Sequence, residues 1–138
     1  MASRFESAAL LAALWRLGSG GKKMPTSHGI LDRALNECVP VLPAALTTSL
    51  SFGNTSVGLR CYELPDILLA AQEALITSEP NPTYLSTDVT LGDGEARQIV
   101  LSHGISTADA KAIGQKLVAA AAEIETQFAI DPDRPAAA

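Results

Sequence analysis

The side chains best suited to acid–base or nucleophilic chemistry near neutral pH are two histidines, His28 and His103, and two cysteines, Cys38 and Cys61. Imidazole is the group whose ordinary pKa allows proton transfer near pH 7, so a general base or an imidazole metal ligand would be one of these two histidines. A thiol becomes a nucleophile when a base lies beside it, as Cys38 and His103 would in a catalytic pair. Nothing in their spacing predicts that they meet.

The two cysteines are separated by 22 residues and form no Cys-x-x-Cys pair. That spacing matches neither a zinc site nor a redox dithiol. Free cysteines are among the most frequently buried residues. The pattern therefore favours two buried thiols over a disulfide.

Acidic residues gather near Gly92-Asp93-Gly94, where Asp88 and Glu95 flank the sequence turn. The segment lacks the regular ladder of oxygen ligands that defines a calcium loop, and a solvated hairpin tip is the alternative. The glycines at 18–21 lack the Gly-Lys-Ser/Thr ending of a phosphate-binding loop. We therefore expect neither a metal site nor a cofactor.

The segment Ser102-His103-Gly104 is predicted to follow a strand and to precede the last helix. Free backbone N–H groups at such a helix start can receive an anion. A small enzyme with a pocket at this junction, using His103 with Cys38 or Cys61, is one reading. A plain connection between a strand and a helix is the other.

Composition narrows the classes of partner. The 138 residues suit one domain, and 47% of them are apolar against 18% charged, which supports a packed core. The formal net charge of −5 opposes a phosphate backbone, so we expect no nucleic-acid partner. No apolar run approaches the roughly 20 residues that span a bilayer. We expect no membrane contact and a cytoplasmic location.

An apolar helix is predicted over residues 3–17, followed by a glycine-rich linker at 18–23. Such a helix must bury its side chains against its own domain, a second copy or another protein. The candidate partner-binding residues are Phe5, Leu10, Leu11, Leu14, Trp15 and Leu17. Whether residues 1–23 are native or a fused segment stays open.

The rest of the chain predicts helices near 28–38, 65–76 and 106–128, the last opened by a capping box at Ser106–Asp109. Alternation predicts hairpins over 49–62 and over 84–101. We therefore expect an α+β fold: two hairpins in a mostly antiparallel sheet, helices on one face and a separate N-terminal helix. The expected divisions are 1–23, a domain at 24–130 and a loose tail at 131–138.

The functional expectation is a non-catalytic binding or assembly protein that self-associates or docks another protein through its N-terminal helix. The small enzyme at residues 102–104 is the alternative. A second alternative is an acidic inhibitor that mimics nucleic acid, although the carboxylates are scattered along the chain.

Overall fold

The computed structural model describes residues 3–26, 29–56, 58–78 and 86–130. Residues 128–130 are described by their backbone alone. The helices are α1 (Arg4–Ser19), α2 (Ile30–Cys38), α3 (Ala44–Thr47), α4 (Leu64–Glu73), α5 (Asp93–Ser102) and α6 (Thr107–Ile130). The strands are β1 (Met24–Pro25), β2 (Phe52–Thr55), β3 (Gly58–Cys61) and β4 (Ser86–Thr87). The α+β class expected from the sequence is confirmed.

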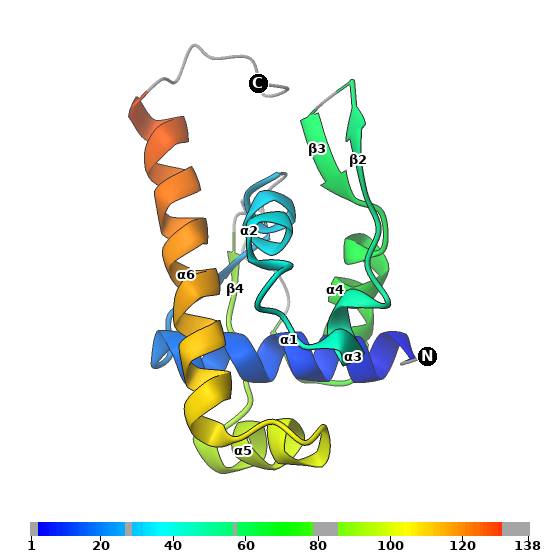
Figure 1. Ribbon diagram of the computed structural model, residues 1–138, viewed down its shortest axis with the longest axis vertical. Helices are drawn as coiled ribbons and strands as arrows, with labels where there is room; N and C mark the ends of the chain where they lie inside the picture. Colours follow the sequence, from blue (N-terminus) through cyan, green and yellow to red (C-terminus); the bar gives the residue numbers. More distant parts are fainter. Residues whose placement is uncertain (1–2, 27–28, 57, 79–85, 131–138) are drawn as a thin grey trace.

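Helix α1 is the centre of the core. Every residue from Ser7 to Trp15 is buried, and α3, α4, α5 and α6 all pack on this helix. Figure 1 shows α6 crossing the C-terminal half of α1, with α4 near its N-terminal end and α5 on another side. A helix that is apolar on all faces has to be surrounded. Here its own chain surrounds it, so the expected boundary near residue 23 does not separate folded units.

The glycine-rich segment after this helix is not a free linker. Gly18 and Ser19 belong to the last turn of α1, and Gly20 ends the helix in the left-handed conformation with a φ of 67°. Glycine suits that position because it has no Cβ. The indole N–H of Trp15 donates to the carbonyl of Lys22 at 2.9 Å. These contacts hold the chain beyond the helix against the body of the protein.

The second expected hairpin is wrong, because residues 93–102 form helix α5 rather than a strand. The apolar stretch at 96–101 is so short that it fits the spacing of a helix as well as that of a strand. Asp93 and Glu95 lie in the first turn of α5, where carboxylates favour a helix, and Ala96 and Val100 are buried one helical turn apart. The turn at Gly92-Asp93-Gly94 is thus a helix start, not a hairpin tip.

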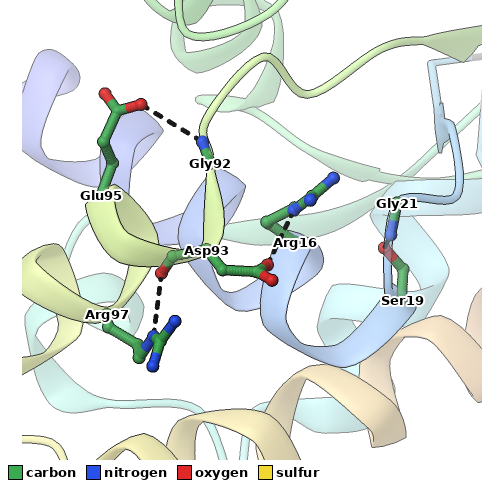
Figure 2. A network of polar contacts seen from close by, with 7 residues as sticks. All are labelled: Arg16, Ser19, Gly21, Gly92, Asp93, Glu95 and Arg97. Carbon is green, nitrogen blue, oxygen red and sulfur yellow. Dashed lines mark hydrogen bonds and ion pairs between the residues drawn. The ribbon is translucent and has the colours of Figure 1, made fainter.

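A polar network joins the C-terminal end of α1 to the start of α5 (Figure 2). Arg16 Nε donates to Asp93 Oδ1 at 3.0 Å, and the Gly92 N–H donates to Glu95 Oε1 at 3.3 Å. Arg97 Nε donates to the Asp93 carbonyl at 3.3 Å. A cation in the last turn of α1 and an anion in the first turn of α5 complement the dipoles of both helices. The Arg16–Asp93 pair is the contact of this network that links α5 to α1.

The strands form two separate antiparallel pairs instead of one sheet. In the first, Phe52 lies opposite Cys61 and Thr55 opposite Gly58, which confirms the hairpin expected within 49–62. In the second, Met24 lies opposite Thr87. Strand β4 therefore pairs with β1, far away in the sequence, and not with the segment that follows it.

The remaining helices follow their sequence signals in part. Pro65 lies in the first turn of α4, and the N–H of Asp109 is capped by Ser106 Oγ at 3.1 Å, as predicted. Helix α4 ends earlier than expected, at Glu73, and a left-handed Leu75 with a φ of 61° follows its C-cap, Ala74. Ser27 and His28 at the predicted start of α2, and the tail at 131–138, lie outside the described residues.

Candidate functional site

The side chains expected to bind a partner are mostly in the core. Leu10, Leu11, Leu14 and Trp15 are each 2% exposed or less, whereas Phe5 is 53% exposed. Leu17 packs partly buried against the same core. Intramolecular packing of α1 thus satisfies the need of these side chains for apolar contact. Leu10, Leu11, Leu14 and Trp15 are therefore out of reach of a partner while the helix is in place, and Phe5 remains exposed.

The residues of the expected strand-to-helix junction lie instead in a turn between two helices. His103 is the C-cap of α5, and Gly104 is left-handed with a φ of 74°. Ser102 Oγ donates to the carbonyl of Ile99 at 2.6 Å, which ties its hydroxyl to the helix end. The strand-to-helix junction at which the pocket was expected is therefore a helix-to-helix turn.

Cys38 and His103 are not brought together. Helix α2 lies along a different part of α6 from α5 (Figure 1). Cys38 lies close enough to Lys116 for that charge to act on its thiol. Lys116 is ten residues beyond Ser106 in the sequence, or about 15 Å along a helix. Burial and the neighbouring Glu37 raise the pKa of Cys38 more than Lys116 lowers it, so the thiol stays protonated at neutral pH.

Metal and membrane sites find no support in the part of the chain that the structure describes. No three His, Cys, Asp or Glu side chains there are arranged to hold a metal ion. None of the helices in those same residues has the length and apolar character needed to cross a membrane. Both cysteines are buried free thiols.

Two exposed carboxylates each lie beside a cation. Asp66 lies 3.9 Å from Arg4, and Asp88 lies 3.7 Å from Lys23. Such exposed pairs add little stability. The two pairs place a positive charge next to each of these two carboxylates.

A cavity of about 390 Å³ lies between the start of α2, the β2–β3 hairpin and the first half of α4. Its apolar wall is formed by Leu64, Pro65 and Leu68 of α4. Its polar lining comes from other elements: Thr26, Asp32, Thr55 and Arg60. Tyr62 and Cys61 complete it. We call this cavity the Arg60 pocket.

The hairpin presents one of its two faces to this pocket. Gly53 lies opposite Arg60 in the register, so strand alternation puts Thr55, Arg60 and Tyr62 on the same face as Gly53. Tyr62 lies over Gly53, where an added Cβ would come within 2.0 Å of its hydroxyl oxygen. The absence of a side chain at Gly53 therefore lets the tyrosine ring form part of the wall.

Asp32 lines the pocket and connects α2 to the hairpin. This residue is 6% exposed as a whole and lies in the first turn of α2. Its Oδ2 accepts the N–H of Cys61 at 2.7 Å, and its Oδ1 lies 3.8 Å from Arg60 Nη1. The second distance brings the charges close but is too long for a hydrogen bond. Asp32 thus holds both the end of β3 and the guanidinium of Arg60.

The thiol and the carboxylate at the end of β3 are not poised for catalysis. Burial raises the pKa of Cys61 to about 11, so the thiol is protonated at neutral pH. Burial alone would raise the pKa of Glu63, but hydrogen bonds from the hydroxyl and the N–H of Ser51 outweigh it and lower that pKa. A protonated thiol beside an ionised carboxylate has no activated nucleophile.

Sequence reasoning missed the pocket. Its polar centre joins Asp32 to Cys61, which are 29 positions apart. The available signal was Asp32 itself, a carboxylate between the buried positions of the stripe through Leu31 and Leu35. A carboxylate in such a place needs a partner.

Comparison of the chain with protein-family models, with curated proteins and with solved structures finds no match.

Proposed function

We propose that this chain is a non-catalytic binding protein that holds a small, largely apolar molecule in the Arg60 pocket. The observation that carries the proposal is the pocket itself: a cavity of about 390 Å³ with an aliphatic wall and an arginine at its polar side. The sequence led us to expect a non-catalytic protein that binds another protein or a second copy, whereas the ligand proposed here is a small molecule. The binding surface is a different one, because the side chains of α1 are occupied by the core.

The size and lining of the pocket favour a small molecule. Ligand sites in proteins usually measure about 300–1,000 Å³ and combine apolar walls with a few convergent polar groups. Leu64, Pro65 and Leu68 supply the wall, and Arg60 supplies donors. A cavity near the lower end of that range suits a ligand with a short apolar body.

The chemistry of the pocket favours binding without turnover. Cys61, the nucleophile in the lining, has its pKa raised to about 11 by burial. The carboxylate of Asp32 is engaged by the N–H of Cys61 and lies next to the Arg60 guanidinium. These groups hold one another in place, and the carboxylate beside the thiol, Glu63, already accepts hydrogen bonds from Ser51.

The proposal is tested by titrating the ¹⁵N-labelled protein with 1-octanol and following the amide resonances. Burial of about seven methylene groups at about 0.8 kcal/mol each gives at most roughly 6 kcal/mol, so a Kd of about 0.1 mM or weaker is expected. We expect saturable shifts at Arg60, Tyr62, Leu64 and Leu68. Shifts spread evenly over the surface, or none, would overturn the proposal.

A pair of neighbouring leucines provides the control. Leu68 lines the pocket, whereas Leu69 is 53% exposed and is not part of the lining. Leu68→Arg should abolish octanol binding and Leu69→Arg should leave it unchanged. Leu68→Phe serves as a second variant that adds volume to the wall without a charge and should weaken binding. Equal binding by all three variants would contradict the proposed site.

A further inference from the structure

Arg60 is held from one side only. Its ion pair with Asp32, at 3.8 Å, is the one polar interaction that the described residues show for it. Nη1 is buried beside that carboxylate without a hydrogen bond. The side chain also lines the pocket and is 19% exposed. A guanidinium has five N–H donors in one plane, so donors remain for a ligand in the pocket.

Asp32 restrains the position of this guanidinium by its charge. Its carboxylate is anchored by the N–H of Cys61 at 2.7 Å, and it lies at the start of α2, where the helix dipole favours a negative charge. An arginine whose orientation is set in advance loses less entropy when it binds an anion. Asp32 therefore acts as a positioning residue for Arg60.

The geometry points to a ligand with one carboxylate group, which the outward donors of Arg60 bind while its apolar body lies along Leu64 and Leu68. This inference rests on the proposed function and specifies the ligand class. Arginine and carboxylate match in shape and charge, and a pair of N–H···O bonds between them is stronger than bonds to a neutral oxygen.

The charges around the pocket favour a monoanion over a phosphate. Arg60 is the cation in the lining, and Asp32 already opposes part of its charge. Glu63, whose pKa is lowered, adds a second negative charge next to Cys61. A dianion would bring a second negative charge to a lining with one cation and the Asp32 carboxylate, whereas a carboxylate ligand brings the smallest charge that still uses the guanidinium.

The test compares three probes with the same eight-carbon body: octanoate, 1-octanol and octyl phosphate, each titrated at pH 7 and low salt. Octanoate is expected to bind at least tenfold more tightly than octanol, and octyl phosphate more weakly than octanoate. Added salt should reduce the octanoate advantage. Tighter binding of octyl phosphate would identify a phosphate site and overturn the carboxylate assignment.

The role of Arg60 is tested with Arg60→Gln, which should remove the preference for octanoate and keep octanol binding. Because this variant leaves Asp32 buried without its cation, Asp32→Asn/Arg60→Gln is the companion that keeps the site neutral. In the wild-type protein, the Nε–H resonance of Arg60 should shift with octanoate and stay in place with octanol. No shift of that resonance at saturating octanoate would overturn the inference, whatever the variants do.

The outcomes separate the two proposals. Octanol and octanoate binding equally well in the pocket would overturn the carboxylate assignment and leave the binding function standing. Failure of both probes to bind there would overturn both.

Discussion

Gly18 of α1 and Gly114 of α6 lie backbone to backbone where the two helices cross. A Cβ on Gly18 would come within 2.1 Å of the carbonyl carbon of Gly114. A Cβ on Gly114 would come within 2.0 Å of the carbonyl oxygen of Leu14. Real Cβ atoms do not approach other atoms so closely. The crossing that buries α1 therefore depends on two residues without side chains.

Gly114→Ala should destabilise the protein by about 2 kcal/mol or more, because the helices must move apart. Alanine's higher helix propensity offsets at most about 1 kcal/mol of that cost. The control is Gly94→Ala in α5, where an added Cβ meets nothing within 4 Å. Urea unfolding compares the two midpoints. A Gly114→Ala protein as stable as the wild type would contradict the packing of α1 on α6.

Leu75→Gly should stabilise the protein. Leu75 follows the C-cap of α4 with a φ of 61°, and the N–H of Ile76 donates to the Ala71 carbonyl at 2.9 Å, as in a helix end that usually contains glycine. The side chain is 81% exposed, so little packing is lost. We expect a gain of about 0.5–1 kcal/mol in the free energy of unfolding. Ala74→Gly, at a negative φ, should instead cost stability.

Asp32→Ala should cost about 3 kcal/mol, since it leaves the Arg60 guanidinium buried without its counter-charge and the N–H of Cys61 without its acceptor. The matched control is Asp66→Ala, because Asp66 forms an exposed pair with Arg4. That change should cost less than about 1 kcal/mol. Thermal and chemical unfolding measure both. Similar losses from the two variants would contradict a buried role for Asp32.

Stability should fall as the pH rises from about 9 towards 11, in part through Cys61. The unfolded thiol loses its proton near its ordinary pKa of 9.0, while the folded thiol keeps it until about 11. The unfolded state thus binds fewer protons in that window, and its relative free energy drops. The effect is isolated as the difference between wild type and Cys61→Ala across pH 8–11. Parallel stability curves for the two proteins would contradict the raised pKa.

The sequence predicted that α1 must be buried but not where. Its apolar residues occur on every face, so the helix must be surrounded by other apolar groups. The pattern does not say whether those groups belong to the same chain, to a second copy or to another protein. The contact of Gly18 with Gly114 decides the matter in favour of the same chain, and that contact joins residues far apart in the sequence. Pairwise tertiary contacts of this kind leave no local pattern.

The error at residues 93–102 came from a short apolar run that suits both helix and strand. The acidic first turn at Asp93 and Glu95 was the stronger local signal, and the pairing of Asp93 with Arg16 reinforces it. The pocket was beyond prediction for a related reason. Arg60 and Asp32 have meaning as a site only once the hairpin is placed against α2.

The central claim is that a small apolar molecule occupies the Arg60 pocket, and intermolecular nuclear Overhauser effects test it most directly. With ¹³C-labelled protein and unlabelled octanoate, we expect cross-peaks from the ligand chain to the methyl groups of Leu64 and Leu68 and to the ring of Tyr62. Cross-peaks to side chains of α5 or α6 instead, or none at saturating ligand, would contradict the account.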